Sequence, residues 1–284
     1  MTSRPSYHLL EIRLSTEKYE AGLSFLYDEG CIGAEEREAD GAVFLKSYFP
    51  SSLSLADLTE TVKKKLGEKA LLDQKSFVLD SSVFKAGKYD PFEFVKGVWV
   101  VPPPELMLES HPVTEKKIMI RPGMGFGTGR DDTTRLAAQN FCSFYKKIRG
   151  VGSVLDVGTG SGILAILARK LGAKKVSAVE IDPDALENAE QNLALNGVTD
   201  IHLYKNITEV HGAYDVVIAN IVTPTILELA NTLRARLKPG GHLILSGILK
   251  EEVPQILSAF DDFKIIGSLA SKEWISVLLY SNPN

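Results

Sequence analysis

From residue 150 onward, short apolar segments alternate with segments in which apolar residues recur at helical spacing. The short segments are rich in β-branched residues, as buried strands are. They lie near residues 153–157, 175–180, 200–204, 214–219 and 242–247. Strands that alternate with helices predict an α/β fold, with a parallel sheet and right-handed crossovers.

The end of the chain departs from this alternation. Two apolar runs, Phe263 to Leu269 and Trp274 to Tyr280, are separated only by Ala270-Ser271-Lys272-Glu273. No helix fits between them, so they predict an antiparallel hairpin at the end of the parallel sheet.

The first third of the chain has its own pattern of elements. A strand, a helix, two strands around Asp40-Gly41, a second helix and a last strand predict a small α+β unit of ferredoxin-like type. The expected ranges are 7–14, 16–29, 32–36, 42–49, 54–66 and 77–84. The unit contains no catalytic pattern, so it is either a docking domain for a macromolecule or a packing and dimerisation module. We favour docking.

These patterns divide the chain into three parts. Residues 1–86 form the ferredoxin-like domain, and residues 117–284 form the larger α/β domain. Residues 87–116 read as a linker with one short strand, Val98-Trp99-Val100-Val101, which ends at a run of three prolines.

The larger domain contains a glycine-rich turn between its first strand and the helix that follows. Val154 to Val157 leads directly into Gly158-Thr159-Gly160-Ser161-Gly162, and helical periodicity begins at Ile163. Such glycines allow a sharp turn and a close approach of the backbone to a ligand. In a doubly wound sheet this turn is where nucleotide-like ligands bind.

The residues around the turn narrow the choice of ligand. A dinucleotide fingerprint requires a third glycine where this chain has Ile163, which disfavours a nicotinamide oxidoreductase. Asp156 precedes the turn and Glu180 ends the next strand, where a carboxylate can accept both ribose hydroxyls. The pattern resembles the S-adenosylmethionine site of Rossmann-like methyltransferases. The alternative is an ordinary glycine-rich turn of an α/β protein.

A second glycine-rich segment precedes the large domain's first helix. Pro122-Gly123-Met124-Gly125-Phe126-Gly127-Thr128-Gly129 is followed at once by Asp131, Asp132, Thr133 and Thr134, which open a helix. A glycine loop beside a helix N-terminus can hold a carboxylate, and S-adenosylmethionine carries one. A flexible loop with ordinary capping residues is the alternative.

The fourth strand of the large domain ends at Ala219-Asn220-Ile221-Val222. An asparagine at the carboxyl end of a strand lies where ligands meet in an open sheet. The Asn220 oxygen and the neighbouring carbonyl groups can accept hydrogen bonds from an amine and align it for methyl transfer. The amine must be neutral, and burial beside a cation lowers the pKa of lysine from its usual ~10.4. A helix cap before Pro224 is the alternative role of Asn220.

Composition excludes several other classes of protein. The net charge of −4 gives no electrostatic reason to expect direct nucleic-acid binding. Cys31 and Cys142 lie far apart, the histidines are scattered, and we expect neither a metal site nor disulfides. We expect no secretory signal behind Met1 and no membrane span, and the two widely spaced cysteines favour a reduced, cytoplasmic setting.

The motifs together resemble the PrmA family of bacterial methyltransferases, which modify the ribosomal large-subunit protein L11. The resemblance covers nearly the whole chain. It rests on the loop from Pro122 to Gly129 with Thr133-Thr134, on Gly158 to Ile166, Glu180 to Ala185, Ala219-Asn220-Ile221, Lys238 to Gly241 and Leu245 to Leu249.

The resemblance implies transfer of several methyl groups from S-adenosylmethionine to lysine and N-terminal amines, with the N-terminal domain gripping the substrate. By position, the family's cofactor contacts fall on Thr134, Gly158, Glu180 and Asn220. With the residues around them, the candidate cofactor-binding set is Phe126, Gly127, Thr128, Thr134, Asp156, Gly158, Gly160, Glu180, Ile181 and Asn220. The candidate catalytic residues are Asn220 and Ile221.

The chain departs from the family pattern in two places. Arg130-Asp131-Asp132 replaces the usual Thr-His-Pro, and Arg121 replaces an aspartate. Two aspartates suit a helix N-terminus but repel a cofactor carboxylate unless Arg130 or Arg121 compensates. Two alternative functions therefore stay open. One is methylation of another protein lysine or of a small molecule, and the other is S-adenosylmethionine binding without catalysis.

Overall fold

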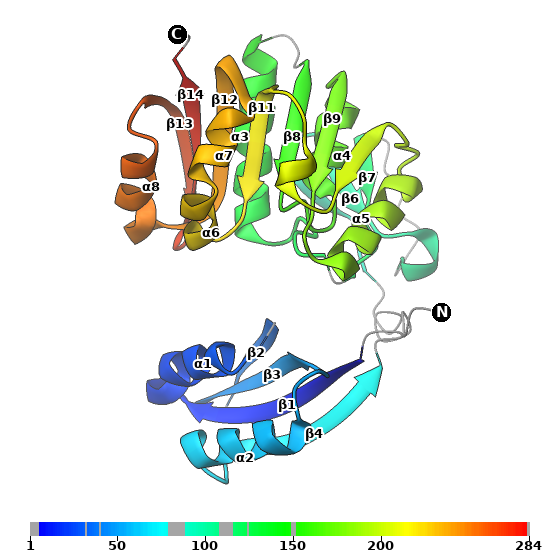
Figure 1. Cartoon of the computed structure of the whole chain (residues 1–284). Helices are drawn as coiled ribbons and strands as arrows, with labels where there is room; N and C mark the ends of the chain where they lie inside the picture. The colour runs from blue at the N-terminus through cyan, green and yellow to red at the C-terminus, as the bar shows by residue number, and fades with distance from the viewer. Residues whose placement is uncertain are drawn as a thin grey trace. The chain divides into compact units, whose positions relative to one another are not determined.

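The computed structural model describes residues 6–31, 33–39, 41–78, 89–107, 116–123, 125–148 and 152–282. The chain separates into two compact units, Met1–Ala86 and Gly87–Asn284 (Figure 1). No helix in the described ranges combines the length and the apolar character needed to cross a membrane.

The first unit is a four-stranded antiparallel sheet with two helices. Its strands lie in the order β2-β3-β1-β4, so the first and last strands of the unit are neighbours. Alternate residues of β1, among them Leu10, Ile12 and Leu14, pack with Leu26 of α1 and Val62 of α2 into one core. The elements are β1 (Ser6–Ser15), α1 (Tyr19–Asp28), β2 (Gly33–Ala39), β3 (Ala42–Pro50), α2 (Leu55–Leu66) and β4 (Leu71–Val78).

The last strand of this unit lies earlier than the sequence pattern predicts. The expected strand was 77–84, whereas β4 is Leu71–Val78, and residues 79–84 lie outside the described ranges. The strand is at the edge of its sheet and exposes Leu72 and most of its polar side chains. An edge strand of this kind lacks the alternation of buried and exposed positions that identifies a strand in a sequence.

The second unit is built on a seven-stranded sheet in the order β10-β9-β8-β11-β12-β14-β13. The first five strands in this order are parallel, as predicted. The predicted terminal hairpin is also confirmed, because β14 runs antiparallel to both β12 and β13. The strands are β8 (Ser153–Val157), β9 (Lys175–Val179), β10 (Ile201–Tyr204), β11 (Tyr214–Asn220), β12 (Leu237–Leu249), β13 (Phe263–Ser271) and β14 (Trp274–Ser281).

Helices cover both faces of this sheet (Figure 1). Consecutive residues of β8 point to opposite faces, so Val154 joins the core under α3 and α4, while Leu155 joins the core under α6, α7 and α8. The helices are α3 (Asp132–Ile148), α4 (Ile163–Leu171), α5 (Pro183–Leu195), α6 (Thr223–Glu228), α7 (Ala230–Ala235) and α8 (Val253–Ala259).

The interval expected as a linker contributes a further small sheet to the second unit. Strands β5 (Phe92–Val95), β6 (Val98–Val101) and β7 (Lys116–Met119) pair in this order. Their inward side chains Phe94 and Ile118 are fully buried in the same core as α3 and α4. The described part of residues 87–116 is therefore folded onto the larger unit, with two strands where the sequence predicts one.

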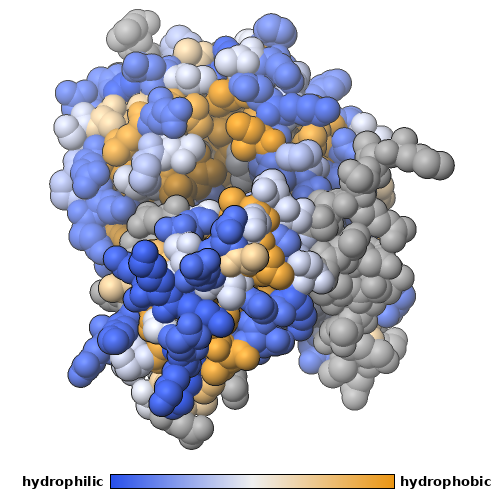
Figure 2. Space-filling model, turned by 60° about the horizontal axis from the view of Figure 1, so that its bottom comes forward, coloured by the Kyte–Doolittle hydropathy of each residue, from blue (hydrophilic) through white to orange (hydrophobic). Residues whose placement is uncertain are grey.

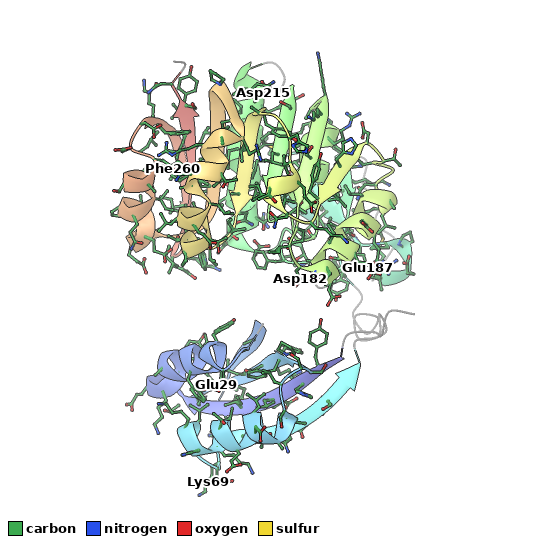
Figure 3. All side chains as sticks on the ribbon, viewed as in Figure 1. Glu29, Lys69, Asp182, Glu187, Asp215 and Phe260 are labelled. Atoms are coloured by element: carbon green, nitrogen blue, oxygen red, sulfur yellow. The ribbon has the colours of Figure 1, made fainter. Side chains whose placement is uncertain are left out.

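The two ends of the parallel strands carry different polar residues. Figure 3 shows Asp215, near the start of β11, at the amino-terminal edge of the sheet and Asp182, just beyond β9, at the carboxyl-terminal edge. Figure 2 is turned toward the Asp182 edge and shows apolar surface gathered in the middle of the second unit. The carboxyl ends of β8, β9 and β11 all meet at this edge.

Candidate functional site

The glycine-rich turn after β8 has a backbone that only glycine accommodates. Gly158, Gly160 and Gly162 all have positive φ angles, of 70°, 55° and 83°. A Cβ atom at Gly158 would lie 2.4 Å from Cγ2 of Ile221, and one at Gly160 would lie 2.3 Å from the carbonyl oxygen of Phe126. The turn therefore packs between the residue that follows β11 and the loop that precedes α3.

Asp156, on β8 just before the turn, is completely buried. Its Oδ2 atom accepts hydrogen bonds from Thr159 Oγ1 at 2.6 Å and from the amide of Ala165 at 3.1 Å. Its Oδ1 atom has no hydrogen-bond partner among the described residues. Burial raises the pKa of Asp156 to about 6, although the two hydrogen bonds act in the opposite direction. The charge of Glu180 raises it further.

Glu180 follows β9 and turns its carboxylate toward the glycine turn. One oxygen accepts a hydrogen bond from the amide of Gly160 at 2.9 Å, and the other accepts one from the amide of Asp182 at 3.0 Å. Each carboxylate oxygen has a second lone pair that can accept a further hydrogen bond. The next residue, Ile181, is 80% exposed, so an apolar side chain borders the carboxylate.

Asn220 is the last residue of β11, and its side-chain amide is held in one orientation. Its Nδ2 atom donates a hydrogen bond to Oγ1 of Thr134, in the first turn of α3, at 2.9 Å. Thr134 is fully buried and Asn220 nearly so, yet the Asn220 Oδ1 atom accepts no hydrogen bond from the described residues. The structure thus brings together two candidate residues 86 positions apart and leaves one buried acceptor without a partner.

The loop before α3 lies directly on the glycine turn. The amide of Ser161 donates to the carbonyl oxygen of Phe126 at 2.8 Å, and the Ser161 hydroxyl donates to the carbonyl oxygen of Gly127. A Cβ atom at Gly125 would lie 2.7 Å from backbone atoms of Gly160 and Ser161. The two glycine-rich segments that the sequence singles out therefore form one surface.

The two aspartates that depart from the family pattern have partners of their own. Asp131 caps α3, since its carboxylate accepts hydrogen bonds from the Thr134 amide at 2.8 Å and the Thr133 hydroxyl at 3.0 Å. Asp132 forms an ion pair with Lys272 at 3.1 Å. An internal carboxylate therefore occupies the helix end where the sequence predicted room for a ligand carboxylate.

The two arginines that could compensate these aspartates have other partners. The Arg130 guanidinium lies 4.3 Å from the centre of the Phe92 ring and donates a hydrogen bond to the carbonyl oxygen of Asp90. Arg121 forms an ion pair with Glu105. The hydrogen bonds that Asp131 accepts and the ion pair of Asp132 with Lys272, rather than these arginines, stabilise the two carboxylates.

One residue near the site was missed by the sequence analysis. The Ser246 hydroxyl, fully buried on β12, donates a hydrogen bond to the carbonyl oxygen of Thr133 at 2.7 Å. This bond ties the start of α3 to the sheet next to Thr134. A lone serine directly after the apolar run Leu243-Ile244-Leu245 was the available signal. Among the described residues, no group of three or more acidic, histidine or cysteine side chains could hold a metal ion.

The sheet order and the turn define a mixed α/β protein with a methyltransferase-like central sheet. The model of one family, described as ribosomal protein L11 methyltransferase (PrmA), matches residues 22–281. The chain belongs to this family.

Relatives named "Ribosomal protein L11 methyltransferase" differ in how much of their length is matched. The Bacillus subtilis protein is 34% identical over 256 residues, which cover 84% of this chain and 80% of the relative. The Citrifermentans bemidjiense protein is 42% identical over 171 residues, which cover 58% of this chain but only 56% of the relative. The chain therefore spans little more than half the length of several relatives that it matches.

A solved structure supports the same fold. The crystal structure titled as a ribosomal protein L11 methylase from Lactobacillus delbrueckii subsp. bulgaricus is 34% identical and superposes with a TM-score of 0.61. The match covers 68% of this chain and all of that chain.

Proposed function

We propose that this protein is an S-adenosylmethionine-dependent methyltransferase that modifies lysine and N-terminal amines of the ribosomal large-subunit protein L11. Family membership and the names of the relatives support the substrate. One observation supports the chemistry above all: the buried Asn220 Oδ1 atom, which accepts no hydrogen bond from the described residues. The protein would meet its substrate in the cytoplasm, where ribosomal proteins are made.

The residues at the carboxyl ends of β8 and β9 fit the nucleoside part of the cofactor. The Gly160 and Asp182 amides fix the Glu180 carboxylate, whose remaining lone pairs suit the two ribose hydroxyls. The positive φ angles of Gly158 and Gly160 allow the sharp turn that brings the Gly160 amide to this carboxylate. The exposed Ile181 side chain offers an apolar surface for the adenine ring. Asp156 stabilises the turn through its hydrogen bonds with Thr159 and Ala165.

The loop before α3 fits the carboxylate of the methionine part. Because Asp131 caps α3, we assign this contact to the loop amides instead of the helix end. The amides of Gly127, Thr128 and Gly129 donate no hydrogen bond to other described residues, and both glycines have positive φ angles. Successive amides in such a backbone form a concave site for anions. Phe126 leads into this segment.

Asn220 orients the amine that receives the methyl group. The bound cofactor supplies a methyl group on a cationic sulfur, which leaves readily. The target amine donates an N–H hydrogen bond to Asn220 Oδ1 and a second one to the Ile221 carbonyl group, which directs its lone pair at the methyl carbon. Methyl transfer to the aligned amine would release the neutral thioether of the cofactor, and the methylated ammonium would then lose a proton to solvent. Alignment of this kind supplies most of the rate enhancement that such a reaction needs.

The apolar surroundings favour the neutral form of the amine. The side chains of Phe126 and Val222 are 62% and 60% exposed and border the site, where they suit the aliphatic stem of a lysine. Removal of water from a lysine amine lowers its pKa from its usual ~10.4. The neutral, nucleophilic form is then present at physiological pH.

The N-terminal unit is proposed to recognise the protein substrate. Its antiparallel strand order β2-β3-β1-β4, with helices after β1 and β3, supports a ferredoxin-like assignment for residues 1–86. A folded unit of this size argues against a small-molecule substrate. We propose residues 117–284 as the catalytic domain.

Methylation of purified L11 protein, followed by mass spectrometry, tests the proposal. The wild-type protein should add methyl groups when S-adenosylmethionine is supplied. Asn220→Ala should reduce kcat about 100-fold or more, because the amine loses its alignment. Asn231→Ala, which removes an exposed asparagine of α7, is the matched control and should leave kcat unchanged.

The outcome also separates the alternative functions. Cofactor binding without methylation of L11 would contradict the proposed substrate and favour another lysine-containing protein or a non-catalytic role. Equal rates for Asn220→Ala and Asn231→Ala would contradict the proposed role of Asn220.

A further inference from the structure

Three asparagines form a stripe along α5 and its C-terminal end. Asn188, Asn192 and Asn196 are spaced four residues apart, so they lie on one face of the helix. All three donate hydrogen bonds to backbone carbonyl groups of residues 119 and 121. These partners lie 67 to 77 positions away in the chain. We call the three side chains the asparagine ladder.

The ladder binds the end of β7 and the residues after it much as a neighbouring strand would. The side-chain oxygen of Asn196 accepts a hydrogen bond from the backbone N–H of Met119 at 2.9 Å, and its side-chain nitrogen donates one to the carbonyl oxygen of Met119. The side-chain oxygen of Asn192 accepts a hydrogen bond from the backbone N–H of Arg121 at 2.8 Å, and its side-chain nitrogen donates one to the carbonyl oxygen of Arg121 at 3.4 Å. On the other side, the amide of Ile120 donates to the carbonyl oxygen of Val101 in β6. The segment that enters the 122–129 loop is therefore held on both sides.

Asn192 also reaches the glycine turn. Its Nδ2 atom donates to the carbonyl oxygen of Ser161 at 2.9 Å. The amide and hydroxyl of the same serine donate to Phe126 and Gly127 in the middle of the loop. One fully buried side chain thus connects the beginning of the loop to the turn on which the loop lies.

A buried amide lowers stability unless its polar atoms are paired, so a hydrophobic residue would serve better if packing were the only need. Asn192 is fully buried; its side-chain oxygen accepts a hydrogen bond from Arg121, just before the loop, and its side-chain nitrogen donates one to Ser161 in the glycine turn. We infer that Asn192 is a positioning residue, which fixes the loop over residues 125–129 against the glycine turn. Its effect on ligand binding depends on the proposed function, whereas its effect on the loop does not.

Hydrogen–deuterium exchange and kinetics on Asn192→Ala test this inference. Peptides covering 119–131 should exchange at least tenfold faster than in the wild type, while peptides from β11 and β12 should not change. The KM for S-adenosylmethionine should rise at least tenfold with kcat within about threefold, because Asn220 and Thr134 are untouched. Asn196→Ala, at the half-exposed end of the ladder, should show the same changes to a smaller degree and is the variant to use if Asn192→Ala does not fold.

Gln191→Ala is the matched control. Gln191 is exposed on the neighbouring face of α5, and its side chain donates to Glu187 of the same helix. Unchanged exchange over 119–131 in both ladder variants would overturn the inference. Faster exchange with an unchanged KM would overturn the link to the cofactor. If wild-type protein bound no S-adenosylmethionine, the proposed function would fail, and the exchange result would still decide whether the ladder holds the loop.

Discussion

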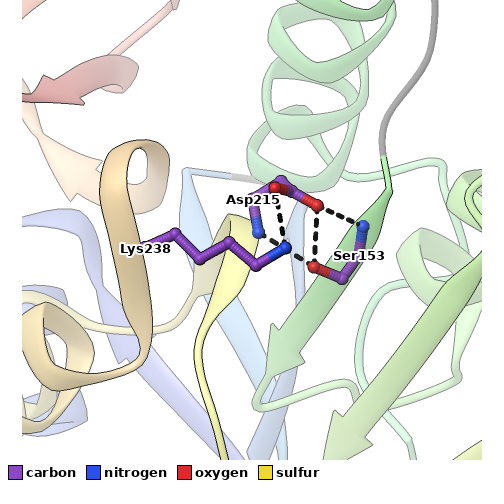
Figure 4. A network of polar contacts seen from close by, with 3 residues as sticks. All are labelled: Ser153, Asp215 and Lys238. Carbon is purple, nitrogen blue, oxygen red and sulfur yellow. Dashed lines mark hydrogen bonds and ion pairs between the residues drawn. The ribbon is translucent and has the colours of Figure 1, made fainter.

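Strands β8 and β11 lie side by side and carry polar residues at both of their ends, but the two ends differ. At the amino end, Asp215 on β11 accepts hydrogen bonds from the Ser153 amide at 2.7 Å, the Ser153 hydroxyl at 2.8 Å and the Lys238 ammonium at 2.9 Å (Figure 4). The Asp215 amide donates back to the Ser153 hydroxyl at 3.0 Å. Both carboxylate oxygens therefore have partners.

At the carboxyl end, the same two strands carry Asp156 and Asn220. Each has a buried side-chain oxygen without a hydrogen-bond partner among the described residues. Burial raises the pKa of Asp156 to about 6. Burial also acts to raise the pKa of Asp215, but the hydrogen bonds from Lys238 and Ser153 outweigh it and lower the pKa below its usual value. Polar groups at the amino end stabilise the fold, whereas those at the carboxyl end keep acceptors free at a cost in stability.

The largest expected difference is in the pH dependence that Asp156 gives to stability. The folded protein holds this proton up to about pH 6, whereas an unfolded aspartate loses it near pH 4. The free energy of unfolding should therefore fall as the pH rises through this window, by about 3 kcal/mol at 1.36 kcal/mol for each pH unit. Asp156→Asn, which cannot ionise, should lack this fall.

Urea unfolding of both proteins between pH 4 and 7.5 measures this difference. Both tryptophans of the chain, Trp99 and Trp274, lie in the second unit, so their fluorescence follows the unfolding of that unit alone. A constant difference between wild type and Asp156→Asn over this range would contradict the raised pKa of Asp156.

A smaller effect, of the opposite pH dependence, is expected at the amino end. Asp215→Ala leaves the Ser153 amide and hydroxyl without their acceptor, which should cost about 2 kcal/mol of unfolding free energy at pH 7. Because the pKa of Asp215 is lowered, its contribution is present above about pH 4 and is lost as the pH falls below that value. The same urea titration measures both. Methyl transfer at a temperature where the variant stays folded should be unchanged.

The smallest effect is expected for Lys238→Met, which removes only the exposed partner of the Asp215 network. Its ion pair with Asp215 is close to solvent, so the loss should be below about 1 kcal/mol. An equal loss in Lys238→Met and Asp215→Ala would mean that the ion pair, and not the bonds to Ser153, holds the amino end.

The sequence predicted the parts of the fold that local patterns encode. The run from Val154 to Gly162 and the terminal hairpin each combine apolar periodicity with turn residues over a short stretch, and both lie where predicted. Glu180 and Asn220 could be placed at one sheet edge because parallel strands end together.

Features that depend on distant contacts were not predicted. Strand β5 is only four residues long, and its place in the sheet depends on the burial of Phe94 in the core under α3 and α4. The asparagine ladder has a regular spacing in the sequence, but only its contacts with Met119 and Arg121 show that it binds the segment before the loop. Asp131 was correctly placed at the start of a helix, yet its sequence did not show that its carboxylate would occupy the helix end itself.

The carboxyl end of the sheet is the proposed S-adenosylmethionine site, and calorimetric titration with this compound measures binding there. The wild-type protein should bind it. Glu180→Ala should weaken binding at least tenfold, because the acceptors for both ribose hydroxyls are lost, and Glu190→Ala, which removes an exposed carboxylate of α5, should bind as the wild type does. Absence of binding by the wild type, or equal affinity of Glu180→Ala and Glu190→Ala, would show that this end of the sheet is not the binding site proposed here.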